Sequence, residues 1–71
     1  MDYKQAIYKE REVDLKATVE QLDLHEAVKV PFSSNLKVSA IRTAISRLNG
    51  KGDYRYSVTE CINHTIITRT V

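Results

Sequence analysis

The residues of this sequence best suited to binding chemistry cluster on one predicted helix, residues 36–49. Its polar positions combine arginines with short hydroxyl and amide side chains, and further cations flank it. Arg and Lys bind phosphate oxygens, and Arg and Asn can also hydrogen-bond base edges from within the major groove. We therefore expect contact with nucleic acid, and with DNA in preference to RNA. The candidate contact residues are Lys37, Ser39, Arg42, Thr43, Ser46, Arg47, Asn49, Lys51 and Arg55.

The charge distribution favours the same interpretation. Residues 27–52 contain five bases and no Asp or Glu, whereas residues 1–26 carry seven carboxylates against four bases. Residues 53–71 are neutral, so the net charge of +2 conceals a strongly basic centre. Solvated protein surfaces normally mix charges of both signs. A helix face without acids therefore suits a polyanionic partner, although an ordinary solvated face is the alternative.

The other reactive side chains predict no catalytic or metal site. Cys61 and His64 have C-x-x-H spacing, but two residues are too few to hold zinc, and no third group orients them as a nucleophile pair. The Gly50-Lys51-Gly52 segment lacks the spacing and the Ser/Thr of a phosphate-binding loop. We expect a non-enzymatic protein without a cofactor.

Tyrosines alternate with basic residues near the C-terminal end of the chain. Tyr54, Arg55, Tyr56 and Arg69 could form a surface on which the bases of a single strand stack. Tyrosine is also common in strands, where its ring packs and its hydroxyl lies at the margin of the sheet. The pattern therefore leaves both a stacking surface and simple sheet packing open.

The first half of the chain is predicted to contain a helix and a short strand. Residues 2–22 are rich in helix formers, and Leu15, Val19 and Leu22 share one helical face. This predicts a helix over 14–22, either extending back to residue 3 or starting at an Asp14 N-cap after a looser arm of residues 1–13. In residues 27–32 the apolar positions alternate and a proline interrupts them, which is typical of an edge strand.

The second half is predicted to be a helix followed by a hairpin. Val38, Ile41, Ala44, Ile45 and Leu48 form a core-facing stripe along residues 36–49. Residues 33–35 are suitable N-caps, and Gly50 suits a left-handed C-terminal residue. Residues 54–58 and 64–71 have strand composition, with Asn63 suited to the turn. The prediction is a single α+β domain, residues 1–71, with helices covering a three-stranded antiparallel sheet.

Composition limits the class of protein further. A chain of 71 residues forms one small domain, and its single Cys61 cannot form an internal disulfide. No apolar run approaches the ~20 residues that span a membrane, so we expect no membrane contact. The single unpaired cysteine and the lack of an export signal predict an intracellular, cytoplasmic protein. A core of this size leaves about 3–5 kcal/mol of net stability, which keeps homodimerisation open.

Residues 27–71 resemble small uncharacterised proteins of bacteriophages. The resemblance rests on VPFSSN and LKVSAIRTAISRLN, followed by a hairpin that ends in TIITRT. It implies a compact phage or bacterial accessory protein, located in the host cytoplasm if phage-encoded. The helix and hairpin are also similar in topology to the recognition helix and wing of winged-helix DNA binders. However, residues 23–35 have a strand and a turn in place of the middle helix of those proteins. A ribbon–helix–helix fold fits less well, because a hairpin replaces its second helix.

The alternative function is a protein-interaction module. Such a module would be a phage-type modulator of a host protein or a self-associating structural protein. The contact would then be a sheet edge at Val28–Phe32 or apolar residues exposed on the first helix. The acidic segment of residues 10–26 could also bind the basic helix of a second copy.

Overall fold

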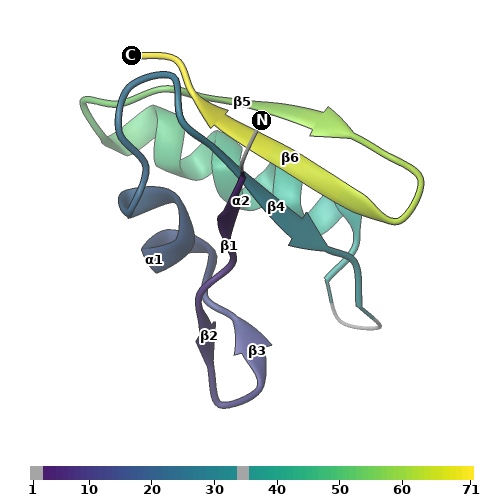
Figure 1. Ribbon diagram of the computed structural model, residues 1–71. Helices are drawn as coiled ribbons and strands as arrows, with labels where there is room; N and C mark the ends of the chain where they lie inside the picture. Colours follow the sequence, from purple (N-terminus) through teal and green to yellow (C-terminus); the bar gives the residue numbers. More distant parts are fainter. Residues whose placement is uncertain (1–2, 34–35) are drawn as a thin grey trace.

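The computed structural model describes residues 3–33 and 36–71 as a small α+β domain (Figure 1). Its main sheet has four strands in the order β1-β4-β6-β5. These strands are β1 (Lys4–Gln5), β4 (Ala27–Pro31), β5 (Tyr56–Glu60) and β6 (His64–Arg69). The helices are α1 (Leu15–Glu20) and α2 (Val38–Lys51), and a separate hairpin consists of β2 (Tyr8–Lys9) and β3 (Glu12–Val13).

The hydrophobic core lies between the main sheet and the two helices. Both helices contribute to it, as do the central strands, whose alternate side chains point to the same face. The buried aliphatic residues are Val19, Leu22, Val28, Val30, Ile41, Ile45 and Ile67. We call this face of the sheet the helix side and the other face the open side. Figure 1 shows α2 lying across the helix side.

The local signals around α1 and α2 are confirmed in their main features. Asp14 is the N-cap of α1, and its Oδ1 accepts a hydrogen bond from the Ala17 backbone N–H at 3.1 Å. Ile41 and Ile45 are buried as the apolar stripe of α2 predicts. The β5–β6 hairpin also forms, with Val58 opposite Ile67 and Glu60 opposite Thr65.

The predicted helix extension over residues 3–13 is wrong. Residues 4–5 form β1, which pairs in parallel with β4, and residues 8–13 form the β2–β3 hairpin. The hairpin turn places Glu10 at φ 53° and Arg11 at φ 69°, the left-handed pair of a two-residue type I′ turn. Neither residue is the Gly or Asn that would signal such a turn, and the pairing of β1 with β4 depends on residues distant in sequence.

The predictions of a three-stranded sheet and of an edge strand at residues 27–32 are also wrong, because β1 pairs with β4. The sheet has a fourth strand, and β4 lies between β1 and β6 rather than at an edge. Val28 and Lys29 are therefore paired on both sides, opposite Lys4 and Gln5 of β1. The strand that occupies the other edge of the sheet is β5.

The predicted ends of the second helix and of its hairpin also shift. The helix begins at Val38 after Lys37, which makes no side-chain capping bond, and Ser33 instead bridges Leu36. Ser34 and Asn35 lie outside the described residues. Gly50 is inside the helix, which continues to Lys51, and no described glycine has a positive φ. Asn63 lies in the β5–β6 loop without a positive φ, and β5 begins at Tyr56 instead of Tyr54.

Candidate nucleic-acid interface

The exposed surface of α2 carries most of the predicted contact residues. Its periodicity buries Ile41 and Ile45 against the sheet, which turns the positions between them outward. We use the term α2 cations for Lys37, Arg42, Arg47 and Lys51, all of which have exposed side chains. Among the described residues, none of the four makes an ion pair or a side-chain hydrogen bond.

The α2 cations lie on two flanks of the helix rather than in one row. At 3.6 residues per turn, Arg42 and Arg47 point about 140° apart around the axis, whereas Arg47 and Lys51 lie about 40° apart. The outward ridge between the flanks consists of small exposed residues, Ser39, Thr43, Ser46 and Gly50. The Thr43 hydroxyl donates to the Ser39 carbonyl at 2.9 Å, so it turns back onto the helix. The sequence pattern predicted one polar face, and the helix divides its charges between two sides.

Asn49 is held by the sheet instead of being presented to a ligand. Its Nδ2 donates to the Tyr56 carbonyl at 3.2 Å, and its Oδ1 accepts from the Tyr56 backbone N–H at 2.9 Å. The amide thus occupies the position that a neighbouring strand would take at the start of β5. This partner lies seven residues away across a turn, so local sequence pattern could not indicate it.

Arg55 is likewise occupied within the chain. Its Nη1 donates to the carbonyls of Asn49 at 2.7 Å and Gly52 at 3.1 Å. A guanidinium at these carbonyls satisfies acceptors that the end of a helix leaves free, and its charge opposes the negative end of the helix dipole. Arg55 therefore fixes the C-terminal end of α2 onto the turn that leads into β5.

Three of the four residues of the predicted stacking surface, Arg55, Tyr56 and Arg69, make contacts within the chain. Tyr56 is only 9% exposed and belongs to the core, and burial raises the pKa of its hydroxyl. The Arg69 guanidinium lies 3.8 Å from the centroid of the Tyr54 ring and donates to the Leu22 carbonyl at 3.1 Å. These contacts join β6 to the segment that follows α1 and to the segment that precedes β5. They leave Tyr54 as the exposed aromatic residue of the set.

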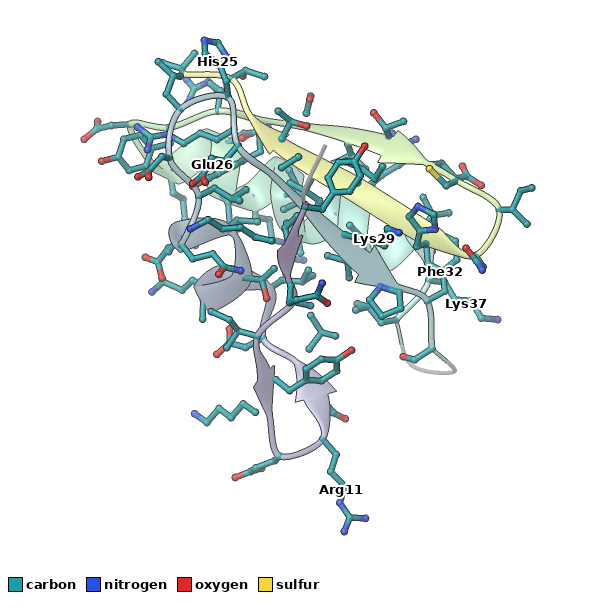
Figure 2. The ribbon with its side chains drawn as sticks, in the orientation of Figure 1. Arg11, His25, Glu26, Lys29, Phe32 and Lys37 are labelled. Atoms are coloured by element: carbon teal, nitrogen blue, oxygen red, sulfur yellow. The ribbon has the colours of Figure 1, made fainter. Side chains whose placement is uncertain are left out.

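The described cations outside α2 include one that is ion-paired. Lys4 Nζ lies 3.5 Å from Glu26 Oε1, and the Asp23 backbone N–H donates to the same oxygen at 2.7 Å. This backbone hydrogen bond, with the nearby Lys4, lowers the pKa of Glu26. Figure 2 shows Glu26 and His25 near one end of the molecule, Arg11 at the far end of the β2–β3 hairpin, and Lys37 beside the connection from β4 into α2.

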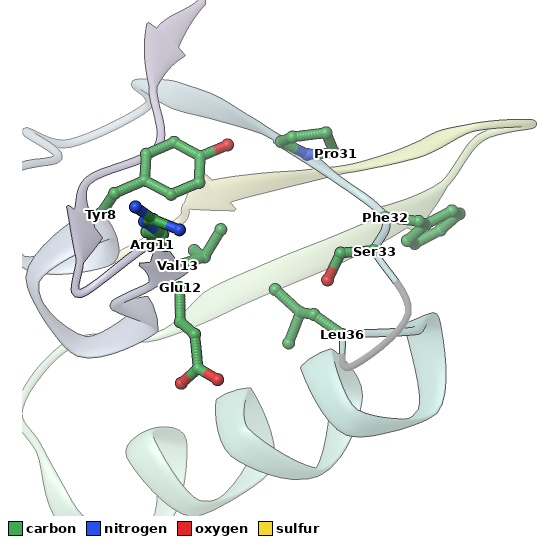
Figure 3. A pocket seen from close by; sticks show the side chains of 8 residues that line it. All are labelled: Tyr8, Arg11, Glu12, Val13, Pro31, Phe32, Ser33 and Leu36. Carbon is green, nitrogen blue, oxygen red and sulfur yellow. The ribbon is translucent and has the colours of Figure 1, made fainter.

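Two depressions mark the described surface, one beside the β2–β3 hairpin and one between the helices. One, of about 370 Å³, lies between the β2–β3 hairpin and the end of β4, with Tyr8 and Arg11 on one side and Pro31 and Phe32 on the other (Figure 3). The second, of about 480 Å³, lies between α1 and the end of α2, where Lys16 and Lys51 border an apolar floor of Val19 and Leu48. The second depression adjoins the Arg47 flank of α2 at Lys51, and its α1 wall carries both Lys16 and Glu20, whose charges offset each other.

The remaining reactive groups are dispersed. Cys61 is half-buried, and His64 Nδ1 lies 2.7 Å from Asn63 Oδ1. In residues 3–33 and 36–71, no three His, Cys, Asp or Glu side chains gather in a metal-binding arrangement. Neither α1 nor α2 has the length and apolar character needed to cross a lipid bilayer.

The fold and the surface of α2 together define a small α+β domain with an exposed cationic helix. No protein-family model, no curated protein sequence and no solved structure matches this chain.

Proposed function

We propose that this protein is a small non-enzymatic nucleic-acid-binding domain that contacts the phosphate backbone through the α2 cations. The observation that carries the proposal is the exposure of the α2 cations, three on the helix and Lys37 at its N-cap, with no carboxylate within ion-pair distance of them in the described chain. Cations that are not neutralised within the protein can pair with phosphates and displace the counterions condensed on the nucleic acid. The release of these counterions is the main source of affinity for nucleic acid.

The arrangement of charges on α2 favours duplex DNA. The major groove of B-DNA admits a helix, and phosphates line both of its walls. Arg42 on one flank and Arg47 with Lys51 on the other could each reach one wall, while the small ridge of Ser39 and Ser46 approaches the base edges. The major groove of A-form RNA is too deep and narrow for this approach. Thr43, Asn49 and Arg55 would contribute no direct phosphate contact, because their side chains already have partners within the chain.

The experiment is a salt titration of duplex binding by fluorescence anisotropy. Four phosphate contacts give a slope of log K against log salt of about −3.6, or roughly 150-fold weaker binding between about 50 and about 200 mM salt. The double variant Arg42→Ala with Arg47→Ala should halve the slope, to about −1.8, and bind more weakly at every salt concentration.

A matched control removes the same amount of charge elsewhere. Lys9 lies on the β2–β3 hairpin and Lys29 on the open side of the sheet, and both are exposed. Lys9→Ala with Lys29→Ala should leave the slope near that of the wild type. Single-stranded DNA and duplex RNA serve as competitors, and both should bind more weakly than duplex DNA. If the Arg42 and Arg47 variant binds duplex DNA like the control, α2 is not the contact surface.

A further inference from the structure

Strand β5 has a free backbone edge. It ends the sheet order β1-β4-β6-β5. The Thr70 N–H donates to the Arg55 carbonyl, and the Cys61 N–H donates to the His64 carbonyl. The odd-numbered residues along β5 therefore direct their backbone N–H and C=O groups toward β6. Because backbone groups alternate along a strand, Tyr56, Val58 and Glu60 direct their N–H and C=O groups away from β6.

Asn49 covers only the first of these outward residues. Its amide takes both backbone groups of Tyr56. Among the described residues, the outward groups of Val58 and Glu60 make no hydrogen bond. The segment Tyr56–Glu60 has no Lys, Pro or bulge, which are devices by which edge strands avoid pairing, and its one charged residue is Glu60 at the end of the strand. Two consecutive outward residues are therefore open to another strand.

This open segment is complementary to itself. When two copies of β5 run antiparallel around a two-fold axis at Thr59, Val58 of each copy faces Glu60 of the other. Each such pair exchanges two backbone hydrogen bonds, so the contact makes four. Thr59 faces Thr59 across the axis on the open side, and Thr–Thr pairs are favourable on a sheet surface.

The two neighbouring registers of the β5–β5 pair are less favourable than the Thr59 register. Centring the pair on Glu60 places two carboxylates directly opposite each other, which is destabilising. Centring it on Val58 requires the backbone groups of Tyr56, which Asn49 already occupies. The Thr59 register avoids both conflicts. It also places Ile62, whose side chain is fully exposed at 101%, toward the Tyr56 end of the second copy's β5.

We propose that this chain forms a symmetric dimer by antiparallel pairing of β5 with β5 of a second copy, in the register Val58–Glu60 and Thr59–Thr59. An isologous contact of this kind closes on itself and leaves no further β5 edge. Both α2 helices then lie on the same side of a continuous sheet. The dimer does not depend on nucleic-acid binding and is tested without it.

Disulfide trapping tests the register directly. In a Cys61→Ser background, Thr59→Cys places two thiols across a pair whose Cα atoms are about 4.5 Å apart, within disulfide range. Ser57→Cys is the matched control, because Ser57 is also exposed on the open side of β5 but lies about 14 Å from its counterpart across the axis. Mild oxidation of dilute protein should cross-link the Thr59→Cys protein at least tenfold faster than the control. Equal rates, or no cross-linking of either, overturn the proposal.

Charge substitution gives a second readout by sedimentation equilibrium, with circular dichroism to confirm folding. The wild type and Ser57→Lys should show a reversible monomer–dimer equilibrium. Thr59→Lys and Thr59→Glu should each be monomeric, because like charges then face each other, and mixing the two should restore a heterodimer. A wild type that is monomeric up to about 1 mM, or a mixture that does not associate, refutes β5 pairing.

Discussion

Replacing Asn49 by alanine tests whether this residue belongs to the framework of the fold or to the proposed nucleic-acid contact. The substitution removes two hydrogen bonds, of 2.9 and 3.2 Å, between the amide and the backbone of Tyr56. Each bond has a net value of about 1 kcal/mol, so the pair contributes about 2 kcal/mol. Alanine is the better helix former by about 0.6 kcal/mol, which offsets part of the loss.

We therefore expect Asn49→Ala to lower the free energy of unfolding by about 1–1.5 kcal/mol, which is about 5–10 °C in Tm for a domain of this size. Water can reach the edge strand and replace the lost partners, so the full cost of a buried unsatisfied group does not apply. Urea denaturation followed by far-UV circular dichroism measures the change, with the denaturant slope held as a check on two-state behaviour.

Two variants control for the helix itself. Ser46→Ala lies one turn earlier on α2, where Ser46 is exposed and makes no side-chain hydrogen bond in the described structure, and it should stay within about 0.5 kcal/mol of the wild type. Asn49→Asp keeps the shape but loses the donor and adds a negative charge near the C-terminal end of the helix. It should therefore be at least as destabilising as Asn49→Ala.

Binding measurements complete the Asn49 test. Duplex affinity measured well below the unfolding transition should be unchanged in Asn49→Ala, because the amide is already occupied by Tyr56. If Asn49→Ala unfolds like the wild type but loses tenfold or more in affinity, the structural role assigned to the amide is refuted. Asn49 would then be part of the same proposed contact surface as the α2 cations.

Two further stability predictions come from backbone strain and from a buried hydroxyl. Arg11→Gly should raise the free energy of unfolding by about 1 kcal/mol, since glycine adopts the φ of 69° without strain. Arg11→Ala should give no such gain. Equal urea midpoints for the two variants would show that the turn is unstrained. Thr65→Val should be more stable by about 1–2 kcal/mol, because the Thr65 Oγ1 is buried without a hydrogen-bond partner in the described chain. The control is Thr68→Val on the same strand, which is half-buried on the open side and should change stability little; a less stable Thr65→Val would contradict the reasoning.

The parts of the fold that follow from local sequence are those with short-range causes. The Asp14 cap and the Ile41 and Ile45 stripe depend on residues within one or two turns, and both were predictable. The β5–β6 hairpin needs only two β-rich segments joined by a short loop. The cap and the stripe involve residues within a few positions of one another, and the hairpin pairs, 5 to 13 positions apart, are brought together by one short loop.

The errors arise where a distant partner decides the conformation. Residues 4–13 have helix-forming composition, but β1 pairs with β4 and the Ile7 backbone N–H donates to the Thr18 hydroxyl at 2.9 Å. These contacts join residues that are 11 to 24 positions apart, so the composition of residues 4–13 cannot predict them. The strained turn at Glu10 and Arg11 hid the hairpin as well, because turn prediction depends on Gly and Asn.

The predicted contact residues also fall into two groups, those whose position follows from local sequence and those whose position depends on distant partners. Exposure of Arg42 and Arg47 follows from helical periodicity once the buried stripe is known. The internal partners of Asn49 and Arg55 do not, because they depend on how the turn after α2 folds back onto the helix. A polar residue at the end of a helix can serve the backbone or a ligand, and only its neighbours in space distinguish the two.

This division determines how mutational data on α2 should be interpreted. Arg42 and Arg47 project from flanks held in place by Ile41 and Ile45, so their removal changes charge and leaves the described packing intact. Asn49 and Arg55 instead join the end of α2 to β5, and their removal would loosen the helix and expose more of the strand edge. An alanine scan of the nine predicted contact residues would therefore mix two effects. Only a variant with unchanged unfolding free energy and a reduced salt slope would identify a residue that touches phosphate.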